Sequence, residues 1–192
     1  FLSCGIALWV GDHVSDPNKM FYASPEALAA LGATMCMQHN VEAVDADART
    51  VTVVNLVTGE RFVDHYDKLV LTTGSAPVRP QLPGIDNPHL YYCKDWHDAN
   101  RLRAVTADVD SVIVIGAGYI GAELAEQYAL AGKKVTVIDA FERMLAKNFD
   151  ADITARIEAQ YRAHGTTLAL GQKVTGLSGE SEVTVTPDSG TY

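Results

Sequence analysis

One stretch constrains the fold of this chain more than any other: residues 112–139, read as VIVIGAGYIGAELAEQYALAGKKVTVID. It starts with a short apolar run at 112–115, which is typical of a strand buried on both faces of a parallel sheet. A run of good helix formers follows at 122–131, and a second apolar strand is expected at 135–138. The order strand, turn, helix, strand predicts a βαβ unit in an α/β fold.

The turn between the first strand and the helix has the spacing GxGxxG, formed by Gly116, Gly118 and Gly121. The first glycine permits a tight turn, the second lets backbone approach a pyrophosphate, and the third lets helix pack close to strand. Asp139 ends the second strand, where this fold places an acid that binds a ribose 2′-hydroxyl. That carboxylate favours NAD over NADP, although the nearby Arg143 softens the preference. The alternative is a βαβ unit that binds no nucleotide.

Composition and charge narrow the class of protein. The 192 residues carry a formal net charge of −9, which disfavours nucleic acid or an anionic membrane as a partner. We expect no membrane span and no secretory segment, because no apolar run approaches roughly 18 residues. The cysteines lack CxxC spacing, so neither a metal site nor a disulfide framework is expected. A reducing, cytoplasmic location fits this cysteine usage.

Two modules are expected, residues 1–109 and residues 110–192. In the first, signals for caps, β-branched runs, turns and proline predict the following: a helix capped by Ser3, a helix begun by Ser24-Pro25 and stopped at Gly32, strands at 41–44, 50–57 and 60–66, a short buried strand at 69–72, an extended loop at 76–88 and a helix at 95–106.

The second module continues past the βαβ unit with a loop at 144–149, a helix at 151–163 and a strand at 167–170. A strand-like alternation at 182–186 precedes a Pro-Asp-Ser-Gly turn. The chain starts without an initiator Met and stops soon after this turn, so both ends look cut.

Cys4 is a candidate redox residue. In the first turn of a helix it would meet the positive end of the helix dipole and free N–H groups, and its pKa would then fall toward neutrality. The alternative is a small buried hydrophobic residue, which is how we interpret Cys36 and Cys93.

Three segments together resemble the flavin- and NAD-dependent NADH oxidases and NADH peroxidases, with their relatives the coenzyme A disulfide reductases. FLSCGIALWVG is similar to the redox-cysteine segment, YDKLVLTTGSAP to an FAD-contacting segment, and the glycine-rich stretch to the NAD-binding segment. The order and spacing of these segments match across essentially all 192 residues. The sequences SCGIALW and CKDW resemble most closely those of water-forming NADH oxidases of lactic acid bacteria. The resemblance implies an incomplete FAD-binding Rossmann-like domain with a β-meander, at 1–109, and a truncated NAD-binding domain, at 110–192.

The resemblance also implies site roles. Cys4 corresponds to the redox cysteine that cycles between thiolate and sulfenic acid, and Tyr119 to the aromatic residue that covers the flavin until nicotinamide displaces it. The residues that would contact FAD are Ser3, Val41, Thr72, Thr73, Gly74, Ser75 and Lys94. Those that would line the NAD(H) site are Gly116, Gly118, Gly121, Ile120, Glu123 and Asp139. For Tyr119 the alternative role is an aromatic residue that packs against the start of a helix. At position 148 this chain has Asn, where relatives have a Tyr that contacts the nucleotide.

The implied activity is reduction of O2 to water by NADH through FAD, with O2 or peroxide as the small-molecule substrate. A stabilised sulfenic acid suits a cysteine without a close resolving partner. An NADH peroxidase, a coenzyme A disulfide reductase and, in a different class, a nucleotide-binding module without activity stay open. An earlier FAD-binding glycine motif and a C-terminal domain that forms a homo-oligomer are expected outside residues 1–192.

Overall fold

The computed structural model describes residues 1–180, 182–190 and 192. They form two compact units: Phe1–Phe21 with Ala76–Tyr192, and Tyr22–Ser75. The expected boundary near residue 110 separates cofactor-binding segments, a different criterion from compactness, and it stays a prediction.

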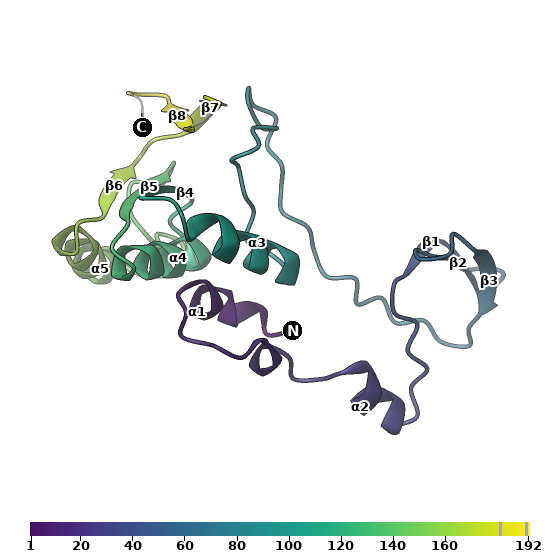
Figure 1. Ribbon diagram of the computed structural model, residues 1–192. Helices are drawn as coiled ribbons and strands as arrows, with labels where there is room; N and C mark the ends of the chain where they lie inside the picture. The colour runs from purple at the N-terminus through teal and green to yellow at the C-terminus, as the bar shows by residue number, and fades with distance from the viewer. Residues whose placement is uncertain (181, 191) are drawn as a thin grey trace. The chain divides into compact units, whose positions relative to one another are not determined.

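The larger unit is built on a parallel sheet with the strand order β4-β5-β6. The three strands are Ser111–Ile115, Lys134–Asp139 and Thr167–Leu170. Helix α4, Tyr119–Leu130, connects β4 to β5, and α5, Ala151–Ala163, connects β5 to β6 (Figure 1). This succession confirms the α/β, Rossmann-like class expected from the glycine-rich stretch, because parallel neighbours need a helical crossover.

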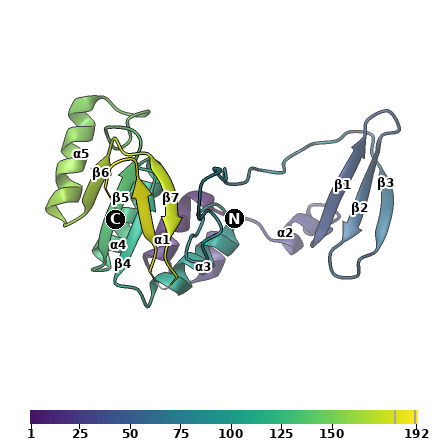
Figure 2. The same ribbon diagram turned by 90° about the horizontal axis from the view of Figure 1, so that it is seen from above.

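The two faces of this sheet bury alternate residues of each strand. Val137 packs with residues of the helices, whereas the adjacent Ile138 packs on the opposite face with residues of a hairpin. The hairpin is β7, Val174–Ser178, paired antiparallel with β8, Thr184–Pro187. It lies against the side of the sheet away from α4 and α5 (Figures 1 and 2). Strand β8 overlaps the expected alternation, but β7 was not expected, because its sequence carries a glycine and no clear period.

Short helices at the start of the chain pack beside the sheet. A 3₁₀ turn, η1, at Ser3–Gly5 leads into α1 at Ile6–Val10, and a second 3₁₀ turn, η2, covers Pro17–Met20. They meet α3, Trp96–Thr106, in an apolar cluster in which Ile6, Trp9, Met20 and Ala99 are buried. The rings of Trp9 and Trp96 lie 5.0 Å apart. This cluster fixes the first residues of the chain to a helix from its middle.

The smaller unit is the expected meander. Strands β1, His39–Asp45, β2, Thr50–Asn55, and β3, Arg61–His65, pair antiparallel in sequence order. Helix α2, Pro25–Ala30, precedes them, and the Ser24 side chain accepts a hydrogen bond from the Ala27 N–H. The N-cap and the hairpin turn at Gly59, with φ of 76°, are therefore confirmed.

The buried strand expected at 69–72 is wrong. These residues form no strand, and the Leu69, Val70 and Leu71 side chains are 39%, 78% and 69% exposed. A parallel strand is stable only beside neighbours that satisfy its backbone groups. None of the described strands pairs with this segment, so its apolar composition alone does not produce a strand.

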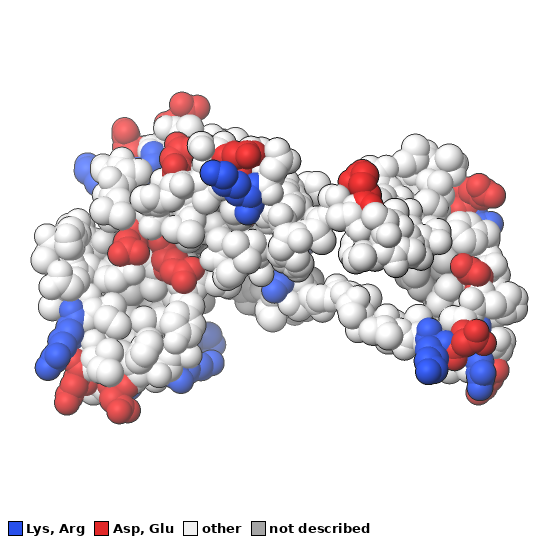
Figure 3. Space-filling view, turned by 90° about the horizontal axis from the view of Figure 1, so that it is seen from below, with Lys and Arg blue, Asp and Glu red and all other residues white. Residues whose placement is uncertain are grey.

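Charged side chains of both signs are spread over the face shown in Figure 3, with uncharged surface between them. Within residues 1–180, 182–190 and 192, no helix has the length and apolar character needed to cross a membrane. The same residues contain no group of three or more His, Cys, Asp or Glu that could hold a metal ion.

The third glycine of the turn provides a stability test. A Cβ at Gly121 would overlap the Gly116 carbonyl oxygen, whereas a Cβ at Gly118 would meet nothing within 4 Å. We expect Gly121→Ala to lower the free energy of unfolding by about 1–3 kcal/mol, as overpacking does, and Gly118→Ala by less than about 1 kcal/mol. Urea unfolding followed by fluorescence of Trp9 and Trp96, both in this unit, measures the difference. Equal losses would contradict this account of Gly121.

Candidate functional site

The glycine turn connects β4 to α4 and leaves the start of the helix without a side-chain cap. Gly116 has φ of 107°, a conformation that favours glycine, and its N–H donates to the Ile138 carbonyl at 2.8 Å. Gly118 is the N-cap of α4, and no side chain caps the helix. The first N–H groups of α4 are therefore available to an anionic group.

Asp139 holds the turn in place. One carboxylate oxygen accepts from the Ala117 N–H at 2.5 Å, and the other accepts from the Phe141 N–H at 2.7 Å. An ionised carboxylate has about four acceptor positions, so acceptor capacity remains for a hydroxyl group. The residue expected to bind a ribose thus also organises the loop around it.

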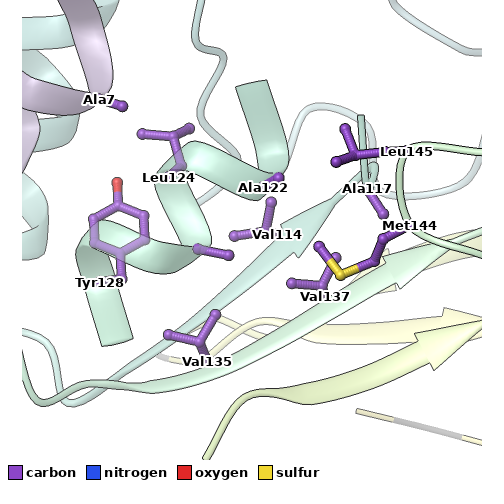
Figure 4. Close-up of a cluster of buried hydrophobic side chains, with 11 residues drawn as sticks. Ala7, Val114, Ala117, Ala122, Leu124, Tyr128, Val135, Val137, Met144 and Leu145 are labelled. Carbon is purple, nitrogen blue, oxygen red and sulfur yellow. The ribbon is translucent and has the colours of Figure 1, made fainter. Parts of the chain in front are cut away.

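Helix α1 crosses α4 and brings the start of the chain to this turn. Ala7 of α1 packs in one buried cluster with Leu124 and Tyr128 of α4 and Val137 of β5. Figure 4 shows Ala7 facing Leu124, with Tyr128 on the next turn of α4. Because η1 runs directly into α1, this packing determines where Ser3 and Cys4 lie.

A capping box fixes the segment on the other side. The Asp98 carboxylate accepts from the Lys94 N–H at 2.8 Å, and Asp95 accepts from the Asp98 N–H at 2.9 Å. These bonds anchor the first turn of α3 and hold Cys93 and Lys94 just before it.

These elements enclose a cavity of about 340 Å³, called here the thiol cavity. Its walls combine apolar side chains with hydroxyl, ammonium, carboxylate and thiol groups. The lining residues are Ser3, Cys4, Ile6, Ala7, Cys93, Lys94, Tyr119, Ile120, Glu123 and Leu124.

Six of the residues singled out from the sequence therefore share one cavity: Ser3, Cys4, Lys94, Tyr119, Ile120 and Glu123. The three glycines and Asp139 form the adjoining turn. Val41 and the segment Thr72, Thr73, Gly74 and Ser75 belong to the smaller unit, where all five are exposed. They are not among the residues that line this cavity.

The expected helix start at Ser3 is wrong in detail. Residue Leu2 is the N-cap of the 3₁₀ turn and Gly5 that of α1, and neither start has a side-chain cap. Cys4 lies within the 3₁₀ turn and is exposed. A helix of five residues has a small dipole, so the helix-start argument does not explain the reactivity expected of Cys4.

Among the cavity residues that the sequence did not indicate, Cys93 is the one with a thiol. Burial, and after it the nearby carboxylates of Asp98 and Glu123, together raise the pKa of its thiol to about 11. The sequence did place Cys93 directly before Lys94, an expected FAD contact, and this could have indicated that it lies near the site. The wide separation of Cys4 and Cys93 in the sequence gave no reason to pair them.

Tyr119 lies at the start of α4, where its side chain is 51% exposed. Its ring meets Phe149 edge-on, with centroids 6.1 Å apart. A half-exposed ring with one aromatic contact can move with little loss of buried area, which suits a residue that covers a site.

A second cavity of about 430 Å³ in the same unit contains none of the expected site residues. Its charges are largely balanced, because Arg79 pairs with Asp86 at 2.7 Å and Arg101 lies over the Tyr91 ring. We therefore take the smaller thiol cavity as the candidate site.

Comparisons with known proteins show which family the chain belongs to. The family model described as pyridine nucleotide-disulphide oxidoreductase matches residues 3–192. An NADH oxidase from Enterococcus faecalis is 47% identical over 91% of this chain and 39% of its own length. A coenzyme A polysulfide/persulfide reductase from Pyrococcus horikoshii is 32% identical over 98% of this chain and 42% of its own.

Among solved structures, a water-forming NADH oxidase from Lactobacillus brevis bound to NADH superimposes with a TM-score of 0.97 at 48% identity. The match covers 100% of this chain and 43% of that one. The chain thus spans about two fifths of the length of the relatives it matches.

The Asp139 carboxylate generates a binding prediction. We expect Asp139→Asn to raise the ratio of NADPH to NADH affinity by at least about fivefold, because like charges about 4 Å apart cost roughly 1–4 kcal/mol. Isothermal titration of both nucleotides measures the ratio. The control is Asp152→Asn, which makes the same charge change at an exposed position of α5. An unchanged ratio in Asp139→Asn would show that this carboxylate does not select the nucleotide.

Proposed function

Because the chain belongs to the pyridine nucleotide-disulphide oxidoreductase family, we propose that it acts as an FAD-dependent NADH oxidase that reduces O2 to water. One observation carries the proposal. The expected redox cysteine, Cys4, and the first turn of the dinucleotide-binding helix, with Tyr119 and Glu123, line the same cavity. Hydride donor and thiol would therefore act at one place.

The turn after β4 fits a dinucleotide. The uncapped start of α4 offers N–H groups to a pyrophosphate, and the open space over Gly116 and Gly118 leaves room for it. Asp139 would accept a hydrogen bond from the ribose. Ile120 and Glu123, which line the thiol cavity from the start of α4, would contact the nicotinamide end of the dinucleotide.

The lining of the thiol cavity suits a ring system with polar edges. Its apolar walls are Ile6, Ala7, Ile120 and Leu124, and its polar groups come from Ser3, Lys94 and Glu123. We propose that Val41 and the 72–75 segment hold other parts of FAD. FAD, when bound, supplies the acceptor for hydride from NADH and the electrons for O2.

The chain's own residues would then control access and complete the reduction. Tyr119 covers the cavity and moves aside for the nicotinamide. The Cys4 thiolate attacks one oxygen of hydrogen peroxide: an S–O bond forms, the O–O bond breaks, and hydroxide leaves and takes a proton to become water. Sulfenic acid remains on Cys4. The two electrons of a second NADH then break the S–O bond, which returns Cys4 to the thiolate and releases the oxygen as a second water.

The remaining parts of the proposal concern partners and location. O2 or peroxide is the small-molecule substrate, and neither nucleic acid nor a membrane is a partner. The protein is cytoplasmic and forms a homo-oligomer through a C-terminal domain outside residues 1–192. The formal net charge of −9 supports the exclusion of nucleic acid, because the long-range field of the protein repels a polyanion.

A second candidate is reduction of a coenzyme A disulfide, with Cys4 forming a mixed disulfide. The similarity to the Pyrococcus horikoshii reductase favours it. The mass of the oxidised protein separates the candidates, because a coenzyme A adduct is heavy. An NADH peroxidase is the other alternative, and it would consume little O2 when NADH is added. The last alternative is a nucleotide-binding module without activity, for which absence of the flavin absorbance near 450 nm would argue.

The product of oxygen reduction tests Cys4. With the full-length protein, we expect Cys4→Ser to release hydrogen peroxide in place of water, because serine cannot form a sulfenic acid. Peroxide released per NADH consumed is the measurement, and Cys36→Ser is the matched control. If Cys4→Ser still yields water, this role of Cys4 is wrong.

A further inference from the structure

The thiol cavity contains two cysteines from distant parts of the chain. Cys4 comes from the 3₁₀ turn η1, and Cys93 comes from the segment anchored by the capping box of α3. Both are free thiols, Cys4 exposed and Cys93 partly buried. The cavity therefore has a thiol that reagents reach easily and a second thiol that is shielded.

The two thiols differ in burial and in the charges around them, and both properties affect how reactive a cysteine is. Cys93 packs against two of the apolar clusters of the unit, which include Ala7 and Trp9 of α1. Burial, then the Asp98 and Glu123 carboxylates, raise the pKa of Cys93 to about 11. At neutral pH Cys93 is therefore a protonated thiol and a weak nucleophile.

We propose that Cys93 is a resolving thiol for Cys4 and forms a Cys4–Cys93 disulfide when peroxide is in excess over reductant. The inference rests on the proposed reaction of Cys4 with peroxide. It adds Cys93, which has no part in that reaction, as a site of disulfide formation. From the sequence, Cys4 is interpreted as a cysteine without a close resolving partner. The shared cavity gives it one.

The chemistry balances in two steps. Hydrogen peroxide, the oxidant, converts the Cys4 thiol to sulfenic acid and releases one water. The Cys93 sulfur, after losing its proton, attacks the Cys4 sulfur: the S–S bond forms, the S–O bond breaks, and hydroxide leaves and takes up that proton as a second water. In sum, two thiols and one peroxide give one disulfide and two waters.

Local structure permits the approach. A disulfide joins cysteines whose Cα atoms lie within roughly 7 Å, so the more loosely held of the two segments would make any adjustment that the bond requires. Cys4 lies in a single 3₁₀ turn, where the Gly5 N–H donates to the Leu2 carbonyl at 3.0 Å, and this turn has few bonds to lose. The segment with Cys93 is held by Asp98, so we assign the movement to Cys4.

The environment of Cys93 makes the second step slow at neutral pH and faster as pH rises. Only the thiolate attacks, so below a pKa of about 11 its concentration rises about tenfold per pH unit. The ionisable groups around it are Asp98 of α3, Glu123 and Tyr128 of α4, and its neighbour Lys94, while α1 contributes none. Sulfenic acid would thus persist during turnover, and the disulfide would form on prolonged oxidation.

The experiment uses the 192-residue chain with Cys36→Ser, which leaves Cys4 and Cys93 as the two thiols, without added flavin. One sample receives hydrogen peroxide, and a second receives diamide, which joins thiols within reach without a sulfenic acid. Intact mass and peptide mapping identify the products, at pH 7.5 and 8.5. The matched control carries Cys93→Ser as well.

We expect both oxidants to give an internal disulfide that links the Cys4 and Cys93 peptides, with the loss of two hydrogens. In the peroxide sample the step from sulfenic acid to disulfide should be about tenfold faster at pH 8.5 than at pH 7.5. In the Cys93→Ser control, peroxide should carry Cys4 on to sulfinic acid, a gain of two oxygens.

Two results would overturn the inference, and a third separates it from the proposed function. Sulfinic acid on Cys4 with Cys93 still a free thiol would refute resolution but support peroxide chemistry at Cys4. No disulfide with either oxidant would show that the thiols cannot meet. A disulfide with diamide but an unreacted Cys4 in peroxide would support the pairing and count against the proposed function.

Discussion

The packing of α1 across α4 is the contact on which the candidate site depends. Helix α1 has five residues and would not persist alone, because so short a helix cannot repay its nucleation cost. It is held by burying Ile6, Ala7 and Trp9 against α3 and α4. Arg103 adds to this hold by lying over the Trp9 ring, 4.0 Å from its centre. Through this contact, a residue near the start of the chain reaches a turn that follows β4.

The turn itself combines packing with recognition. Gly121 lies so close to Gly116 that no side chain fits between α4 and the end of β4, and Asp139 binds the same loop through two backbone N–H groups. A change in either residue would alter both the backbone that receives a pyrophosphate and the carboxylate that faces a ribose. Stability and nucleotide choice are thus coupled at this point of the fold.

The thiol cavity separates two kinds of cysteine chemistry by burial. Cys4 is exposed on a short turn, whereas Cys93 is packed between apolar clusters and near carboxylates. A buried thiol close to negative charge resists ionisation, so proximity alone does not make it reactive. Such an arrangement lets a sulfenic acid exist beside a thiol without immediate conversion, which a solvent-exposed pair would not.

The sequence by itself determined the elements whose signals are local. The helix at 151–163, the strand at 167–170 and the Ser24 cap are where patterns of period and capping predicted them. The glycine spacing and Asp139 likewise identified the turn, because each member acts within one βαβ unit. Only the tertiary structure decided that 69–72 forms no strand, since a strand needs a neighbour to complete its hydrogen bonds, and that Cys93 shares a cavity with Cys4. That second fact depends on α1 crossing α4, a contact between residues far apart in the chain that no local pattern contains.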